Sequence, residues 1–153
     1  MVPSLTEAAL RSHGVLRGAA TVVLAASLVI GCVGRHPVRT VTIGDEHWTV
    51  YENGGEGMRG LPGFGEADGM LFDMGSEVDP AAVAFGMENV GYPIDIAWFD
   101  GTGALVSRAS MTTCAVPPCP LYHADRHYRW AIEAPPGALD DLRPSDRLVV
   151  ADD

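Results

Sequence analysis

Two cysteines and two histidines lie close together in the C-terminal half of the chain, where they could form a disulfide or a metal site. Cys114 and Cys119 flank a proline-rich stretch, and His123 and His127 follow it. These four residue types suit tetrahedral zinc, although the interval between Cys119 and His123 is shorter than in a zinc finger. Two thiols in an exported protein are expected to pair. We therefore predict a Cys114–Cys119 disulfide, with zinc ligation and free thiols as the alternatives.

Three polar residues outside that loop, Asn89, Asp95 and Glu133, form the second candidate site. Asp95 stands at the start of an apolar segment, where burial of a carboxylate is costly unless it accepts hydrogen bonds. It could accept them from backbone N–H groups in the turns at Gly69 or Asn89, or it could line a ligand pocket together with Asn89 and Glu133. Two carboxylates at a suitable separation could also act as acid and base on a glycosidic bond. The sequence leaves these alternatives open.

No other motif indicates a catalytic or cofactor site. The chain has no serine in a nucleophile elbow and no glycine loop of the phosphate-binding kind. Its methionines are not spaced as copper ligands and are better explained as core residues. We therefore predict no cofactor, no catalytic residue and no metal ligand.

The N-terminal segment indicates export. Two arginines precede an apolar run that ends at Gly31 and Cys32, an arrangement that resembles the lipobox of bacterial lipoproteins. The resemblance implies cleavage before Cys32 and attachment of a diacylglyceryl group to its thiol. We expect a signal peptide at residues 1–31, a short tether at 32–38 and a single domain at 39–153, anchored outside the cytoplasm to the bacterial cell membrane. A secreted product and an uncleaved membrane anchor are the alternatives.

The charge of the chain excludes one class of partner. Ten arginines and no lysine stand against twenty acidic residues, a formal net charge of −10. Loss of Arg11, Arg17 and Glu7 with the signal peptide would leave −11. Because no cluster of arginines is present, the basic surface of a nucleic-acid-binding protein is missing. We expect the partners to be the membrane, through the lipid, and a small molecule, an envelope polymer or another protein.

Short β-strands are expected to position these residues. β-Branched and aromatic residues alternate or cluster in seven segments between glycine- and proline-rich turns, namely residues 38–43, 47–51, 69–74, 94–99, 104–111, 128–133 and 147–151. A single turn of helix is predicted at residues 81–85 and a short helix at residues 135–142, and residues 112–125 are predicted to form a loop. The pattern indicates an α+β fold that is mainly β, a compact small barrel or sandwich of antiparallel or mixed strands with one or two short helices.

Several short motifs follow one another along the chain in a definite order. They are Gly69, Met70, Leu71 and Phe72; Phe85, Met87 and Asn89; Pro93, Ile94 and Asp95 with Asp100 and Gly103; Cys114, Cys119 and Tyr122; and Glu133, Pro136 and Gly137. Their order and spacing resemble the DUF192 family over residues 39–150. The resemblance implies a compact β-rich α+β fold, commonly exported or membrane-anchored, with no established reaction. The family's typical Trp-Met-Lys-Asn-Thr run reads Gly-Met-Glu-Asn-Val at residues 86–90, so a ligand that needs that aromatic ring or cation would bind weakly here.

The sequence therefore predicts a non-enzymatic binding or interaction module at the cell envelope. One alternative is an envelope enzyme, for example one directed at glycans, with a carboxylate pocket of Asn89, Asp95 and Glu133. The other is a metal-handling protein that uses the loop containing Cys114 and Cys119.

Replacement of Cys32 by serine is expected to prevent lipidation, because a serine hydroxyl cannot form the thioether that holds the diacylglyceryl group. Cells grown with labelled palmitate should yield a labelled wild-type protein and an unlabelled Cys32→Ser variant. The Cys119→Ser variant also loses one thiol and should stay labelled. Absence of label from the wild-type protein, or its persistence in Cys32→Ser, would contradict the lipid anchor.

Overall fold

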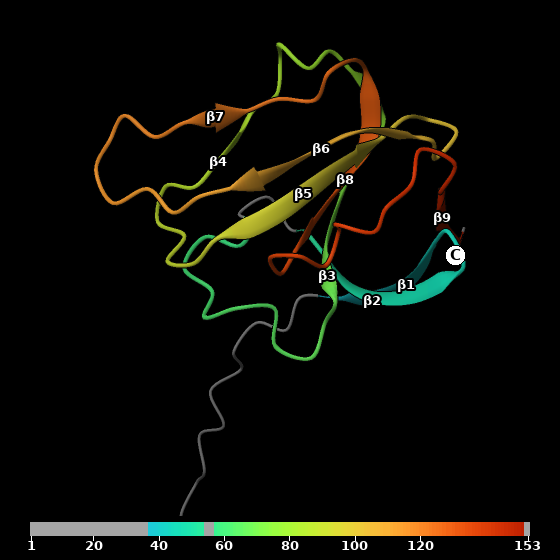
Figure 1. Ribbon diagram of the computed structural model, residues 1–153, viewed down its shortest axis with the longest axis horizontal. Helices are drawn as coiled ribbons and strands as arrows, with labels where there is room; N and C mark the ends of the chain where they lie inside the picture. Colours follow the sequence, from blue (N-terminus) through green and yellow to red (C-terminus); the bar gives the residue numbers. More distant parts are fainter. Residues whose placement is uncertain (1–36, 54–56, 152–153) are drawn as a thin grey trace, which may run out of the picture. The chain divides into compact units, whose positions relative to one another are not determined.

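The computed structural model describes residues 37–53 and 57–151, and these form nine β-strands (Figure 1). The strands are β1 (Val38–Ile43), β2 (Glu46–Glu52), β3 (Gly69–Val78), β4 (Phe85–Gly86), β5 (Ile94–Phe99), β6 (Leu105–Met111), β7 (Leu121–Tyr122), β8 (Tyr128–Ala134) and β9 (Leu148–Val150). Cys32 and the predicted signal peptide lie outside the described residues. Within the described ranges, no helix is long and apolar enough to cross a membrane.

Seven of the strands form one mixed sheet in the order β6-β5-β8-β3-β2-β1-β9. Strands β2 and β3 run parallel, whereas the other paired neighbours run antiparallel. The mainly-β class predicted from the sequence is confirmed. The β-strands predicted at residues 38–43 and 94–99 coincide with β1 and β5, and the remaining five predicted segments are found with shifted ends.

The sheet is buried on both faces at its centre. In β5 all six residues are buried, and their side chains alternate between two hydrophobic clusters because successive side chains of a strand point to opposite faces. Ile94, Ile96 and Trp98 pack in the first cluster, and Ala97 and Phe99 pack in the second. The position of a residue along β5 or its neighbour β8 therefore determines on which face of the sheet its side chain lies.

The two edges of the seven-stranded sheet are linked at one end. Ala104, next to β6, forms an isolated antiparallel bridge with Arg147, next to β9, and Leu148 donates its backbone N–H to the carbonyl of Gly103 at 2.9 Å. Gly103 has a φ of +78°, and a Cβ atom added there would lie 2.1 Å from the carbonyl oxygen of Leu148. The close approach of the two edges thus requires glycine.

A second, two-stranded sheet lies beside the main one and pairs Phe85 with Tyr122 and Gly86 with Leu121 (Figure 1). Both of its strands are only two residues long. Residues 112–125 were predicted as a loop throughout, so β7 corrects that prediction. Two residues carry no periodicity, and hence no sequence pattern could have indicated β7.

The helices predicted at residues 81–85 and 135–142 are wrong. At the first site Asp79 caps a single turn, since its side chain accepts the N–H of Ala81 and its carbonyl accepts that of Ala82, and the chain then extends into β4. The second segment forms successive turns closed by bonds between residues three apart, such as Ala138 to Pro135. Gly137, with a φ of +83°, interrupts the helical conformation there.

Substitution of Gly103 by alanine is expected to destabilise the fold because the new Cβ would collide with the backbone of Leu148. Gly75 is a matched control, since it has a φ of +74° and an added Cβ would meet no atom within 4 Å. Gly75→Ala should cost about 1 kcal/mol, the penalty for the left-handed backbone, whereas Gly103→Ala should cost about 3 kcal/mol or more. Urea unfolding measures both. Equal losses of unfolding free energy in the two variants would show that the close contact between the sheet edges at Gly103 contributes nothing to stability.

Candidate functional site

A cavity of about 280 Å³ lies between β3 and β8 of the main sheet and β4 of the small sheet. Its lining combines apolar side chains with polar and charged ones. Among the described residues it consists of Asn53, Gly57, Met58, Arg59, Phe72, Met74, Val83, Ala84, Phe85, Gly86, Val90 and Glu133. Within this described lining Glu133 is the one acidic side chain and Arg59 the one basic side chain.

Glu133, in the middle of the sheet, is the most unusual residue of the cavity. It is 6% exposed, and its Oε2 atom has no hydrogen-bond partner among the described groups. Burial raises the pKa of Glu133 from the ordinary value of 4.5 to about 7. The carboxyl group can therefore hold or release a proton near neutral pH, or it can pair with a cation that enters the cavity.

The register of β8 places Glu133 on the face of the first cluster. Glu133 pairs with Met70 of β3 and with Ile96 of β5, and both of these side chains belong to that cluster. Gly69 lets β3 approach closely at this point, because a Cβ atom on it would lie 2.6 Å from the carbonyl oxygen of Glu133. The backbone on either side of Glu133 is thus fixed by strand pairing.

Tyr92 is the second polar group enclosed near this carboxyl. Its hydroxyl is buried and has no hydrogen-bond partner among the described groups. Burial, and then the charge on Glu133, raise the pKa of Tyr92 above its ordinary value. The ring packs edge-on against Phe64, with centroids 6.3 Å apart. Phenol and carboxyl thus lie near one another.

One wall of the cavity is the turn at residues 57–60. Its first residue, Gly57, donates its N–H to Asn53 Oδ1 at 2.8 Å. A Cβ atom built on Gly57 would lie 3.4 Å from Phe72 Cζ and 4.0 Å from Glu133 Oε2. The backbone of this turn therefore lies directly against the buried carboxyl, and the exposed Arg59 follows two residues later.

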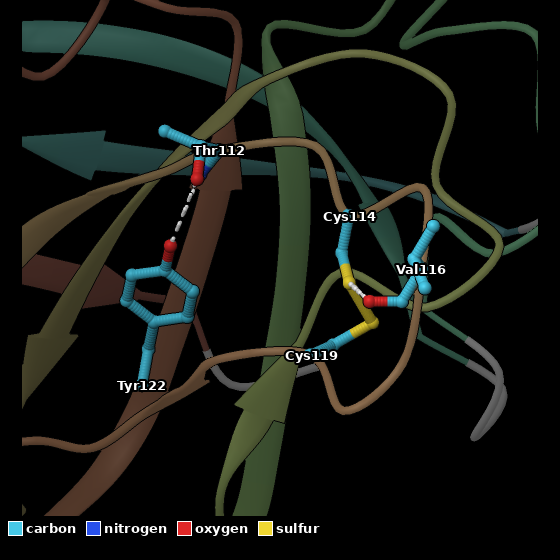
Figure 2. The surroundings of a disulfide bond; sticks show 5 residues. All are labelled: Thr112, Cys114, Val116, Cys119 and Tyr122. Carbon is cyan, nitrogen blue, oxygen red and sulfur yellow. Dashed lines mark hydrogen bonds between the residues drawn. A yellow bond between two sulfur atoms is a disulfide. The ribbon is translucent and has the colours of Figure 1, made fainter.

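The opposite wall is β4, which is held by the loop that contains the two cysteines. Tyr122 pairs with Phe85, and its hydroxyl accepts the N–H of Thr112 at 3.1 Å. The hydroxyl groups of Tyr122 and Thr112 also lie 3.5 Å apart (Figure 2). Cys114 forms an isolated parallel bridge with Glu88. The loop is therefore attached to the wall both at β4 and immediately after it.

The predicted disulfide is present in the structure. Cys114 and Cys119 are bonded, with a Cα–Cα distance of 5.6 Å (Figure 2). This pairing occupies both sulfurs that the zinc alternative needed, and His123 Nδ1 lies 2.8 Å from the carbonyl oxygen of Pro80. Among the described residues, no three His, Cys, Asp or Glu side chains gather as metal ligands.

The structure does not bring Asn89, Asp95 and Glu133 together in one pocket. Asp95 lies on the opposite face of the sheet from Glu133, because it pairs with Ala134, the residue after Glu133. Its carboxylate is buried and accepts the N–H of Gly137 at 2.6 Å. This is the kind of structural role considered for Asp95, but the donor is Gly137 and not the turns at Gly69 or Asn89. Asn89 is exposed, with a φ of +62°, and does not line the cavity.

Sequence reasoning missed the apolar and basic members of the cavity. Phe72 and Phe85 stood in motifs but had no assigned role. The methionines were expected in the core, and Met58 does lie there, in the first cluster, as well as lining the cavity. No sequence pattern indicated a role for Arg59. The segments that line the cavity mix aromatic, sulfur-containing and charged residues, and this mixture is a possible sequence signal. It could not show that these segments lie beside Glu133, because their proximity depends on strand register.

Comparison with known proteins identifies one family. The family model DUF192, described as "Uncharacterized ACR, COG1430", matches residues 48–150. No curated protein matches the chain.

Two solved structures share the fold. One is from Sinorhizobium meliloti 1021 and is described as a candidate transcription regulator, with a TM-score of 0.62, 17% identity, and coverage of 75% of this chain and 95% of that one. The other, a protein of unknown function from Novosphingobium aromaticivorans, has a TM-score of 0.60, 18% identity, and coverage of 76% and 88%. At these identities the likeness concerns the fold alone.

We expect the stability of the protein to fall as pH rises between 4.5, the ordinary pKa of a glutamate, and about 7, the pKa of Glu133 in the folded state. The folded state binds this proton more tightly than the unfolded chain, so the stabilisation is present below the lower value and is lost as pH rises through the upper one. Glu133→Gln stays neutral and should lack this loss. At about pH 8 it should exceed the wild type by about 2 kcal/mol.

The control for this prediction is Glu66→Gln, which removes an exposed carboxylate and should leave the pH profile unchanged. Urea unfolding at a series of pH values gives the profiles. A wild type and a Glu133→Gln variant with parallel profiles would contradict a buried, ionisable Glu133.

Proposed function

The chain belongs to the DUF192 family, and from this premise and the geometry of the cavity we propose that it is a non-enzymatic envelope module that binds a small molecule beside Glu133. The protein is exported and held on the outer face of a bacterial membrane by lipid on Cys32. The ligand enters between β4 and the turn at residues 57–60.

The Oε2 atom of Glu133, buried without a hydrogen-bond partner among the described groups, is the observation that carries this proposal. A buried polar atom without a hydrogen bond costs free energy, and such atoms are rare in protein interiors. Glu133 Oε2 is such an atom, and the residue that carries it lines a cavity. A ligand that donates a hydrogen bond to it would recover the lost interaction.

Export is supported by two features of the sequence and fold. The lipobox-like arrangement at Cys32 provides the anchor, and the Cys114–Cys119 disulfide suits an oxidising compartment, since such bonds are rare in the cytosol. The acidic composition supplies no basic patch, so the lipid would provide the attachment to the membrane.

Catalysis is the second candidate function, and one observation favours it. A carboxyl with a pKa of about 7 is suited to general acid–base chemistry near neutral pH. The two-carboxylate form of that hypothesis loses support, because Asp95 and Glu133 lie on opposite faces of the sheet. Glu133 is then the single acid–base group of this hypothesis. Binding of a ligand requires no second carboxylate.

A bulky side chain at the rim of the cavity is expected to block binding. Ala84 is exposed and lines the cavity, whereas Ala82 is exposed on the same segment and does not. Saturation-transfer NMR with a library of small amines, carboxylic acids, amides and sugars should find binders of the full-length protein. Binding should weaken at least about tenfold in Ala84→Trp and remain unchanged in Ala82→Trp, because only the first indole can fill the cavity.

The comparison of the two tryptophan variants separates cavity binding from surface binding. Circular dichroism and urea unfolding establish that both variants fold. If no library compound binds the wild type, or if Ala84→Trp binds as the wild type does, the proposal is wrong.

A further inference from the structure

The cavity carries opposite charges at different depths. Glu133 is 6% exposed and lies within the sheet, whereas Arg59 is exposed and lies in the turn that forms one wall. The structure gives no ion pair between them. The two groups therefore stand as separate contact points for a molecule in the cavity.

Glu133 favours a cation at the inner end. An ionised carboxylate in an apolar site is unstable unless an opposite charge pairs with it and donates hydrogen bonds. The neighbouring Phe72 and Phe85 rings pack edge to face, with centroids 5.2 Å apart, and both line the cavity. Aromatic rings also attract cations, so an ammonium group suits this end better than a second carboxylate.

Arg59 favours an anion at the outer end. Its turn is held in place, because Gly60 donates its N–H to the carbonyl of Asn89 and Leu61 donates to that of Met58, each at 3.2 Å. No described group forms a hydrogen bond or ion pair with the Arg59 side chain. A guanidinium on a fixed turn is well suited to bind a carboxylate or another planar anion with two hydrogen bonds.

Apolar side chains line the cavity together with the two charged groups. They are those of Met58, Phe72, Met74, Val83, Ala84, Phe85 and Val90. A ligand that joins the two ends would therefore need hydrocarbon in its middle, because a polar group placed against these side chains would lose its hydrogen bonds.

We propose that the ligand is a short organic zwitterion in which an apolar carbon chain separates an ammonium group, bound by Glu133, from an anionic group, bound by Arg59. This inference rests on the proposed function and specifies its ligand class. It also explains why an acidic protein has an arginine in the cavity wall: Arg59 accommodates the anionic end of a molecule whose cationic end the acidic surroundings attract.

Matched probes test each end of the ligand separately. The probes are γ-aminobutyrate and ε-aminocaproate, the amines n-butylamine and n-hexylamine, and the acids butyrate and caproate. Isothermal titration calorimetry with the full-length protein in detergent, against a detergent blank, measures each affinity. At least one amino acid should bind roughly tenfold or more tightly than both its amine and its acid, because each charged end adds a charge-assisted hydrogen bond.

Two variants test which residue binds each charged end of the ligand. In Glu133→Gln, the favoured amino acid should bind no better than its acid does to the wild type, and in Arg59→Gln no better than the corresponding amine. Arg59→Gln changes an exposed side chain, and Glu133→Gln keeps the shape of the buried one, so both should fold. Arg126→Gln, which removes an exposed arginine outside the cavity lining, should leave all affinities unchanged.

The outcomes distinguish this inference from the proposed function. If neither amino acid exceeds its amine and its acid, or if both variants retain the preference, the zwitterion is wrong. Cavity binding itself would still stand if library compounds bind the wild type and Ala84→Trp excludes them. If no compound enters the cavity at all, both proposals fail.

Discussion

The pairing of β3 with β8 is the constraint on which the site depends. Gly69 permits the close approach of the two strands, because any Cβ there would collide with the carbonyl of Glu133. The resulting register turns Glu133 toward the first cluster and its neighbour Ala134 toward the second. A shift by one residue would exchange these two faces. The carboxyl would then leave the cavity, and nothing in the described lining could replace it as an acid.

The small sheet gives the cavity its second wall. A two-residue strand such as β4 has too few hydrogen bonds to be stable alone, so its position must come from other contacts. The loop that contains Cys114 and Cys119 supplies them through Tyr122 and the bridge to Glu88. A disulfide in a small loop restricts few conformations of the unfolded chain and adds modest stability. Its larger effect is to keep the loop, and with it the wall of the cavity, in one arrangement.

The sequence predicted much of the sheet and little of the site, for physical reasons. β1 and β5 were predictable because β-branched and apolar residues fill them between clear turns. The two helices were wrong because Asp79 and Gly137 form local turns that resemble helix ends in sequence. The grouping of Asp95 with Glu133 could not be tested by pattern alone. Which face each occupies depends on strand pairing with residues far away in the chain.

The cost of burying Glu133 favours the proposed binding role over a structural role for this residue. Asp95 is equally buried, yet it accepts the N–H of Gly137 and so contributes to the fold. Glu133 has no such partner for Oε2, and an apolar side chain of similar size would fill its place without the cost of burying a charge. Glu133 therefore costs the isolated fold free energy. Its position beside a cavity, with Arg59 on the adjoining turn, supports the ligand-binding role that we propose.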